Sequence, residues 1–233
     1  MPPTWAAADP RRARPWVTAA IAAAGFLAIT IGVDSGLLIG FDRWMADGDA
    51  ERQGSALYWP ARAGFSLGQN WVFPAASAVT AVVLGIRRRS LRPLLGVVGV
   101  WLVHTLVVGL AKLWAGRPPP GTGDPHLHAD AAELSLRMSY PSGHAANIVV
   151  FSATLAVLVA ALTEDPRWVN RLLAVGAVSA ALCWVCMVYL GYHWATDGFA
   201  GIALGAVVSA LLVPLLACLT VTLPERDLAC DNG

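Results

Sequence analysis

The chain has 233 residues, of which 57% are hydrophobic and only 13% are charged, with a net charge of +1. Soluble domains carry about 25% charged residues, so this composition excludes an ordinary soluble protein. Several apolar runs reach the ~18–20 residues that a helix needs to cross a bilayer. The sequence therefore predicts an all-α, polytopic membrane protein with about six transmembrane helices.

The N-terminal segment, residues 1–16, is rich in proline and arginine and is predicted to be disordered. The first apolar run extends from Val17 to Leu38. It is long for the core of a signal peptide, and no clear small-residue cleavage site follows, so a membrane anchor is favoured over a cleaved signal. Residues 41–62 are amphipathic and contain tryptophan and tyrosine, which favours a position along the membrane surface.

Five further spans complete a single membrane domain over residues 17–219. They are predicted at 65–86, 94–114, 142–162, 172–192 and 199–219, and a short polar tail follows at 220–233. Six spans place both termini on one side, and the segments on that side hold most of the arginines, including Arg87, Arg88, Arg89 and Arg92. The positive-inside rule then predicts cytoplasmic termini in the cytoplasmic (inner) membrane.

Two features inside the spans are expected to be structural. Cys183 and Cys186 form a C-x-x-C pattern in an apolar helix, which lacks the polar partners of a zinc or redox site, so packing in the core is favoured. His104 lies in the middle of a span, and a satisfied position in the core or an interhelical hydrogen bond is expected for it in place of a role in chemistry.

The fourth span is preceded by Tyr140-Pro141-Ser142-Gly143-His144. Ser142 suits a helix cap, and Gly143 lets the backbone approach a ligand. A helix N-terminus favours an anion, and His144 can transfer a proton near neutral pH. The alternative is an ordinary helix cap.

A second motif contains His193 and Asp197, four residues apart. On a helix the two share a face, so the carboxylate can hold one ring nitrogen and raise the basicity of the other. Such a histidine is a nucleophile or a base. The alternative is an interfacial histidine capped by a nearby acid. A metal site is disfavoured because the motif supplies no third strong ligand.

Positive charge ends the third span. Lys112, the only lysine, and Arg117 either extend toward lipid phosphates or, with Ser142 and Gly143, form a pocket for a phosphate. The predicted topology brings both cations and both histidine motifs to the same outer face.

The loop before the fourth span contains a second cluster of possible ligands, namely Asp124, His126, His128 and Asp130. These side chains could hold a metal ion, but in a polar loop the solvated alternative is favoured.

Taken together, these residues resemble the type 2 phosphatidic acid phosphatase superfamily of membrane lipid phosphatases. That family carries Lys-x6-Arg-Pro, then Pro-Ser-Gly-His, then Ser-Arg-x5-His-x3-Asp. The second motif is intact at residues 141–144, and the third keeps His193 and Asp197.

Two positions depart from the family pattern. Counting from Lys112 places Pro119 where the first arginine belongs, although Arg117 stands two residues earlier. Met187 occupies the position of the second arginine.

The resemblance implies that His193 attacks phosphorus to form a phosphohistidine, that Asp197 orients it, and that His144 protonates the leaving oxygen. The residues implied to hold the phosphoryl oxygens are Lys112, Arg117, Ser142 and Gly143. The implied activity is metal-independent hydrolysis, without a cofactor, of a phosphomonoester or pyrophosphate of a polyprenyl or glycerolipid at the extracytoplasmic face. Its expected partners are this lipid phosphate and membrane lipids, with no nucleic acid. Because an arginine is missing, the alternative is a catalytically weak relative that binds or transports a phospholipid or polyprenyl phosphate.

Overall fold

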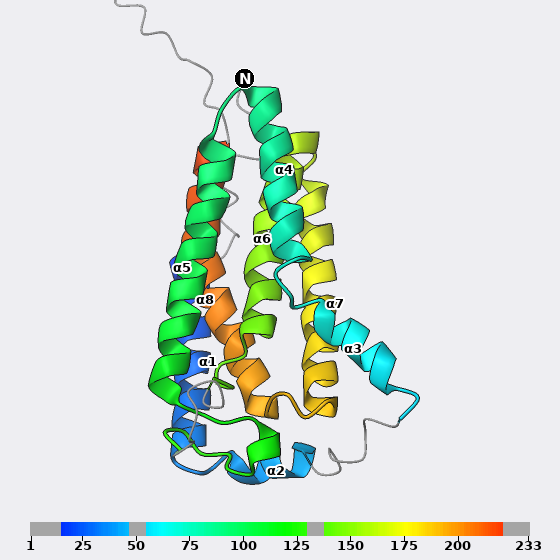
Figure 1. Cartoon of the computed structure of the whole chain (residues 1–233). Coiled ribbons are helices and arrows are strands. Elements are labelled where there is room, and N and C mark those ends of the chain that lie inside the picture. Colours follow the sequence, from blue (N-terminus) through cyan, green and yellow to red (C-terminus); the bar gives the residue numbers. More distant parts are fainter. Residues whose placement is uncertain (1–14, 47–54, 130–137, 221–233) are drawn as a thin grey trace, which may run out of the picture.

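The computed structural model describes residues 15–46, 55–129 and 138–220, and in this part of the chain helices are joined by turns and loops, with one isolated bridge between Arg117 and Met138 (Figure 1). The helices are α1 (Pro15–Asp34), α2 (Ile39–Ala46), α3 (Tyr58–Ser66), α4 (Phe73–Arg88), α5 (Arg92–Ala115), α6 (Gly143–Thr163), α7 (Arg167–Tyr189) and α8 (Ala195–Thr220), with a 3-10 turn, η3, at Pro120–Thr122. Five of them, α1, α5, α6, α7 and α8, are long and apolar enough to cross a membrane. The predicted all-α, polytopic class is confirmed.

The ends of the chain fall mostly outside the described residues. Of the segment 1–16 that is predicted to be disordered, Pro15 and Trp16 belong to α1, and residues 1–14 are not described. Of the predicted tail, Thr220 belongs to α8, and 221–233 are not described.

Helix α6 is the centre of the bundle, and it packs against α4, α7 and α8 (Figure 1). Glycines on its neighbours allow the close approach. A Cβ at Gly201 of α8 would lie 2.3 Å from the Ser142 carbonyl oxygen, and one at Gly205 would lie 3.0 Å from the Ala146 Cα. Backbones in contact at small residues are typical of membrane helices, and here they hold the start of α6 directly against α8.

The second predicted span is wrong in its bounds. The sequence predicts one helix over 65–86, but α3 ends at Ser66, a turn follows, and α4 begins at Phe73. Gly68, Asn70 and Pro74 lie at this break and favour turns and helix starts. Asn147 of α6 stabilises the turn, since its side-chain nitrogen donates to the Gly68 carbonyl (3.1 Å) and to Asn70 Oδ1 (2.9 Å).

The break makes α4 a short helix. Its 16 residues extend over ~24 Å at 1.5 Å per residue, less than the ~30 Å of a typical hydrocarbon core. The remaining residues of the predicted span belong to α3 and to the turn, which lie beside the start of α6.

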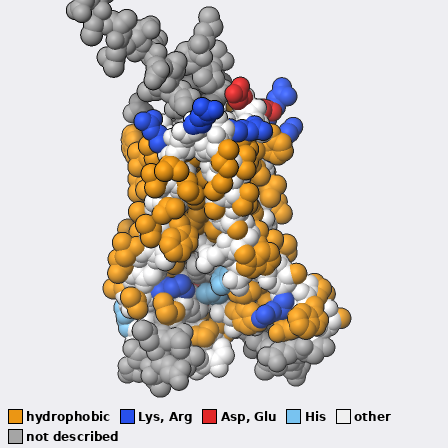
Figure 2. All heavy atoms as spheres, turned by 45° about the horizontal axis from the view of Figure 1, so that its top comes forward, with side chains coloured by type: hydrophobic (Ala, Val, Ile, Leu, Met, Phe, Trp, Pro, Cys, Tyr) orange, Lys and Arg blue, Asp and Glu red, His pale blue; other side chains and the backbone are white. Residues whose placement is uncertain are grey.

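Hydrophobic side chains cover most of the molecular face in Figure 2, and Lys and Arg side chains gather at the end that comes forward. Arg87 and Arg88 end α4 at that side, and Arg92 begins α5. At the opposite end, the short helices α2 and α3 expose Trp44 and Trp59. An apolar band with aromatic and basic borders is the surface expected of a membrane-spanning bundle.

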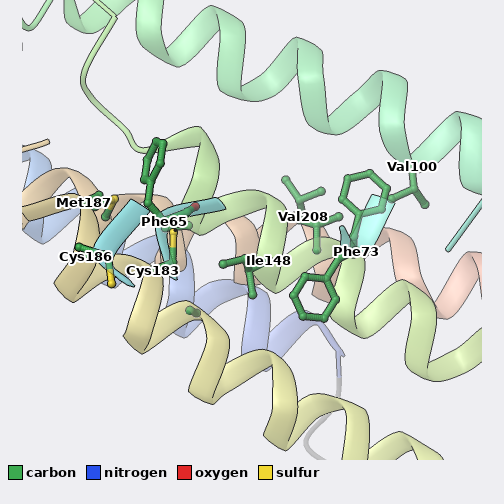
Figure 3. Packing of buried hydrophobic residues seen from close by; sticks show 13 residues of the cluster. Phe65, Phe73, Val100, Ile148, Cys183, Cys186, Met187 and Val208 are labelled. Atoms are coloured by element: carbon green, nitrogen blue, oxygen red, sulfur yellow. Dashed lines mark hydrogen bonds between the residues drawn. The ribbon is translucent and has the colours of Figure 1, made fainter. Parts of the chain in front are cut away.

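The main core confirms the structural assignment of the two cysteines. Cys183 and Cys186 are free and buried, and they pack with Phe65 of α3 and Ile148 of α6 (Figure 3). His104 is also confirmed in an interhelical hydrogen bond, 2.7 Å from Nε2 to Asn147 Oδ1.

Gly201→Ala tests the contact between α6 and α8. The new methyl group would meet backbone at 2.3 Å, so we expect a loss of about 1–3 kcal/mol of stability from overpacking. Gly99→Ala on α5 is the matched control, because a Cβ there has no heavy atom within 4 Å. Thermal unfolding of both variants in detergent measures the difference, and equal midpoints would contradict the close contact.

Candidate active site

His193 lies in the turn between α7 and α8, and Asp197 lies in the first turn of α8. The Asp197 carboxylate oxygen Oδ2 is 3.3 Å from His193 Nδ1 and accepts from the Trp194 backbone N–H at 3.0 Å. Ser139 Oγ donates to the same oxygen at 2.5 Å and lies 3.2 Å from His193 Nδ1. These contacts fix the ring by Nδ1 and leave Nε2 on the opposite edge, as a nucleophilic histidine requires.

The start of α6 is tied to the start of α8. The Ser142 backbone N–H donates to the Asp197 carbonyl at 2.8 Å, and Ser142 Oγ accepts from the Ala145 N–H at 3.5 Å as the helix cap. The cap predicted for Ser142 is therefore present. The first N–H groups of α6 thus lie next to the turn that carries His193, where the helix dipole favours an anion.

Lys112 adds a positive charge at this helix start. Its Cε lies 3.6 Å from the position that a Cβ on Gly143 would occupy, and its ammonium donates to the Met138 carbonyl. The absence of a side chain at Gly143 leaves this space to the lysine and to a ligand. The structure therefore brings Lys112, Ser142 and Gly143 together, as the sequence predicts.

The rings of the two histidines lie close together. The ring centroids of His144 and His193 are 6.2 Å apart with an interplanar angle of 68°. A ligand that contacted both rings would therefore meet a group able to give or take a proton on either side. The Phe65 ring packs on His144 at 4.2 Å and supports it from α3.

Arg117 has a different position from the one expected of a phosphate ligand. It is completely buried, and all its guanidinium nitrogens are engaged by the protein. Nη2 donates to Asp42 at 2.5 Å, Nη1 donates to Asp197 Oδ1 at 2.6 Å, and Nε donates to the Pro125 carbonyl at 2.7 Å. In this structure Arg117 anchors the carboxylate that holds His193, because its donors are already satisfied.

Asp42 of α2 was not selected from the sequence. It is fully buried, and besides Arg117 it accepts from the Thr196 backbone N–H at 2.9 Å and from Thr196 Oγ1 at 2.6 Å. It therefore caps the first turn of α8 as well as neutralising Arg117. Its local sequence carries little signal, since Asp42 stands between Phe41 and Arg43 in an amphipathic segment that holds further acids.

Tyr140 links α1 to the same region. Its hydroxyl is 2.6 Å from Thr30 Oγ1, and its ring lies 5.9 Å from the Arg117 guanidinium carbon. Burial raises the pKa of Tyr140 to about 12, so this hydroxyl stays protonated.

Met187, which stands where the family places an arginine, is completely buried. Its sulfur accepts a hydrogen bond from Ser142 Oγ at 3.3 Å, and its methyl carbon lies 2.3 Å from the position of a Cβ on Gly198. An apolar side chain fills this position behind the helix start.

His126 and His128, in the loop after α5, contact different partners. His126 Nδ1 bonds Asp124 at 2.8 Å with both side chains about half exposed (51% and 52%), whereas the His128 ring packs on Trp114. The hydrogen bond from the His126 backbone N–H lowers the pKa of Asp124. Within the described residues no three His, Cys, Asp or Glu side chains come together in a way that could hold a metal, and Asp130 lies outside them.

Comparisons with known proteins identify relatives of the chain. The model of the PAP2 superfamily matches residues 93–218. A curated undecaprenyl-diphosphatase from Sulfolobus acidocaldarius is 38% identical over 77 residues, which cover 33% of this chain and 33% of that protein. The match thus spans a third of the length of this relative.

A solved structure shares the fold. The crystal structure of a transmembrane PAP2 type phosphatidylglycerolphosphate phosphatase from Bacillus subtilis superimposes with a TM-score of 0.69 over 87% of this chain and 95% of that chain. The sequence identity is 20%, so this comparison bears on the arrangement of helices alone.

Asp42→Ala tests the buried ion contact. Removing one partner of a buried charge network leaves the others uncompensated, so we expect a loss of about 3–5 kcal/mol of stability. Asp42→Asn should lose less, because its amide oxygen can still accept from Thr196. Asp34→Ala, at an exposed position, is the control in thermal unfolding measurements. A loss at Asp42 no larger than that at Asp34 would contradict the assignment.

Proposed function

The chain belongs to the PAP2 superfamily, and on that basis we propose that it is an integral-membrane lipid phosphatase acting through a phosphohistidine on His193. Its substrate is a phosphomonoester or pyrophosphate of a polyprenyl or glycerolipid. The observation that carries the proposal is the pair of histidines 6.2 Å apart at the N-terminus of α6, one of them held by a buried carboxylate.

In the first step, His193 Nε2 forms a bond to phosphorus while the bond to the leaving oxygen breaks. His144 gives a proton to that oxygen. In the second step, water attacks phosphorus, the P–N bond breaks, and His144 takes the proton of the water. Asp197 stabilises the positive charge on His193 during the first step, because its carboxylate lies on Nδ1.

Charge on the transferred group is stabilised by Lys112 and by the N–H of Gly143 at the helix start, and the Ser142 hydroxyl joins them by turning its O–H from the Met187 sulfur to the phosphate. We propose that these fixed donors take the place of a metal ion, so that hydrolysis proceeds equally with and without a chelator. Arg117, assigned to the phosphate from sequence, acts instead through Asp197 in this proposal.

A polyprenyl diphosphate is the first substrate to test, because the Sulfolobus relative is an undecaprenyl-diphosphatase. The second candidate function is binding or transport of a lipid phosphate with weak catalysis. One observation favours it. Met187 replaces one arginine of the family pattern, and Arg117 is paired with Asp42 and Asp197, so fewer cations are available to a phosphate.

We expect His193→Ala to abolish release of phosphate from every lipid phosphate, because the nucleophile is lost. His144→Ala should slow lipid substrates about 10²–10⁴-fold through loss of the acid, and nitrophenyl phosphate much less, since nitrophenolate leaves without a proton. The assay measures phosphate from purified protein with and without chelator, and trapping of the phosphoenzyme by acid quench tests the intermediate. Binding of a lipid phosphate without hydrolysis or phosphoenzyme would support the second candidate.

The side of the membrane is a separate proposal. The arginines that end α4 and begin α5 lie at the end of the bundle away from Lys112, so the active site faces the extracytoplasmic side. The short helix α4 is taken as a sixth crossing beside the five long helices, which places both termini in the cytoplasm. We expect an impermeant thiol reagent to label Thr122→Cys in intact cells. Leu91→Cys, exposed at the other end, should stay protected. Both variants are made in a background with Cys218 and Cys230 replaced by serine, and the reverse pattern would invert the topology.

A further inference from the structure

The active site lacks a cation for part of a highly charged substrate. Met187 fills the second family arginine position with an apolar side chain, and Arg117 is neutralised by Asp42 and Asp197. Among the described residues, the positive charge that remains for a phosphate comes from Lys112 and from the N-terminus of α6. A lipid diphosphate carries more negative charge than these groups balance, so a further cation near the two histidines would stabilise its binding.

Arg62 of α3 is connected to both histidines through shared neighbours. It is three residues from Phe65 and therefore shares a helix face with it. The Phe65 ring packs on His144 at 4.2 Å and on Tyr192 at 5.0 Å. Arg62 Nη1 donates to the Tyr192 hydroxyl at 2.6 Å, and Tyr192 directly precedes His193. One tyrosine thus separates Arg62 from the nucleophile, and one phenylalanine separates it from the proton donor.

The charge of Arg62 is available to an anion. The side chain is exposed, and among the described residues its hydrogen-bond partner is the neutral Tyr192 hydroxyl, with no carboxylate in an ion pair. That hydrogen bond raises the pKa of Arg62, which stays charged. Arg117, in contrast, is buried between two carboxylates.

The direction of the reaction places the leaving group near Arg62. In an in-line displacement the leaving group departs opposite to the nucleophile, here from His193 toward His144. Phe65 packs on His144, the proposed donor to the leaving oxygen, and Arg62 lies one turn away from Phe65 on the same helix. An anionic leaving group would meet the guanidinium there, whereas a neutral lipid alcohol would gain little from it.

We propose that Arg62 binds the lipid-side phosphate of a lipid diphosphate and thereby directs this enzyme toward diphosphates over monophosphates. The inference rests on the proposed phosphohistidine function. His193 Nε2 bonds to the terminal phosphorus, and the bond from that phosphorus to the bridging oxygen breaks. The electron pair stays on the bridging oxygen, His144 protonates it, and the lipid monophosphate leaves from Arg62. Water then releases inorganic phosphate from His193.

The test compares farnesyl diphosphate with farnesyl monophosphate. Charged hydrogen bonds contribute about 1.5–3 kcal/mol, so Arg62→Gln should lower kcat/KM for the diphosphate about 10- to 100-fold. The monophosphate should change less than about threefold, since it lacks the phosphate that Arg62 holds. Arg62→Lys should restore part of the loss. Tyr192→Phe removes the hydrogen bond that positions the guanidinium, so its kcat/KM for the diphosphate should lie between those of wild type and Arg62→Gln.

Arg167→Gln is the matched control, because Arg167 is exposed at the start of α7, at the other end of the bundle. Equal loss on both substrates, or no loss, would overturn the role of Arg62. Calorimetric binding of farnesyl diphosphate to His193→Ala, with and without Arg62→Gln, keeps the inference separate from catalysis. If wild type hydrolyses neither compound, the proposed phosphatase function is wrong. Tenfold weaker binding of farnesyl diphosphate by the double variant than by His193→Ala would then still support the role of Arg62 in binding the diphosphate. Unchanged binding would overturn it.

Discussion

The guanidinium of Arg117, buried between the carboxylates of Asp42 and Asp197, is the contact on which the active site depends. Moving a charge out of water costs several kcal/mol per ion, and the attraction offsets this only when the partners are close and fully hydrogen-bonded. Here every guanidinium nitrogen has an acceptor, including the Pro125 carbonyl. The contact therefore requires α2, the loop after α5 and the first turn of α8 to assemble together.

Because of this contact, the two carboxylate oxygens of Asp197 have different partners. Oδ1 faces Arg117, and Oδ2 receives Ser139, the Trp194 N–H and His193. A carboxylate held from both sides fixes the orientation of the His193 ring. Arg117 therefore affects the reaction by positioning Asp197. Positive charge toward a phosphate then comes from Lys112 and the start of α6, while Arg62 lies outside on a separate helix.

The sequence predicted those features that local patterns encode. The long apolar runs identified five spans, and the spacing of His193 and Asp197 identified their contact. The break before α4 was missed because apolar residues stand on both sides of it, although Gly68, Gln69 and Asn70 interrupt the apolar run. Asp42 and Arg62 were missed for another reason: each acts through a partner far along the chain, Thr196 and Tyr192 respectively, and single-sequence spacing carries no signal of such pairs.

The glycine contact between α6 and α8 has a mechanical consequence. His144 and His193 stand at the ends of two helices whose backbones touch at Gly201, so neither helix can slide or rotate to widen the space between them. The reacting pair is therefore preorganised, because its spacing is set by the packing of α6 on α8 and not by the arriving lipid.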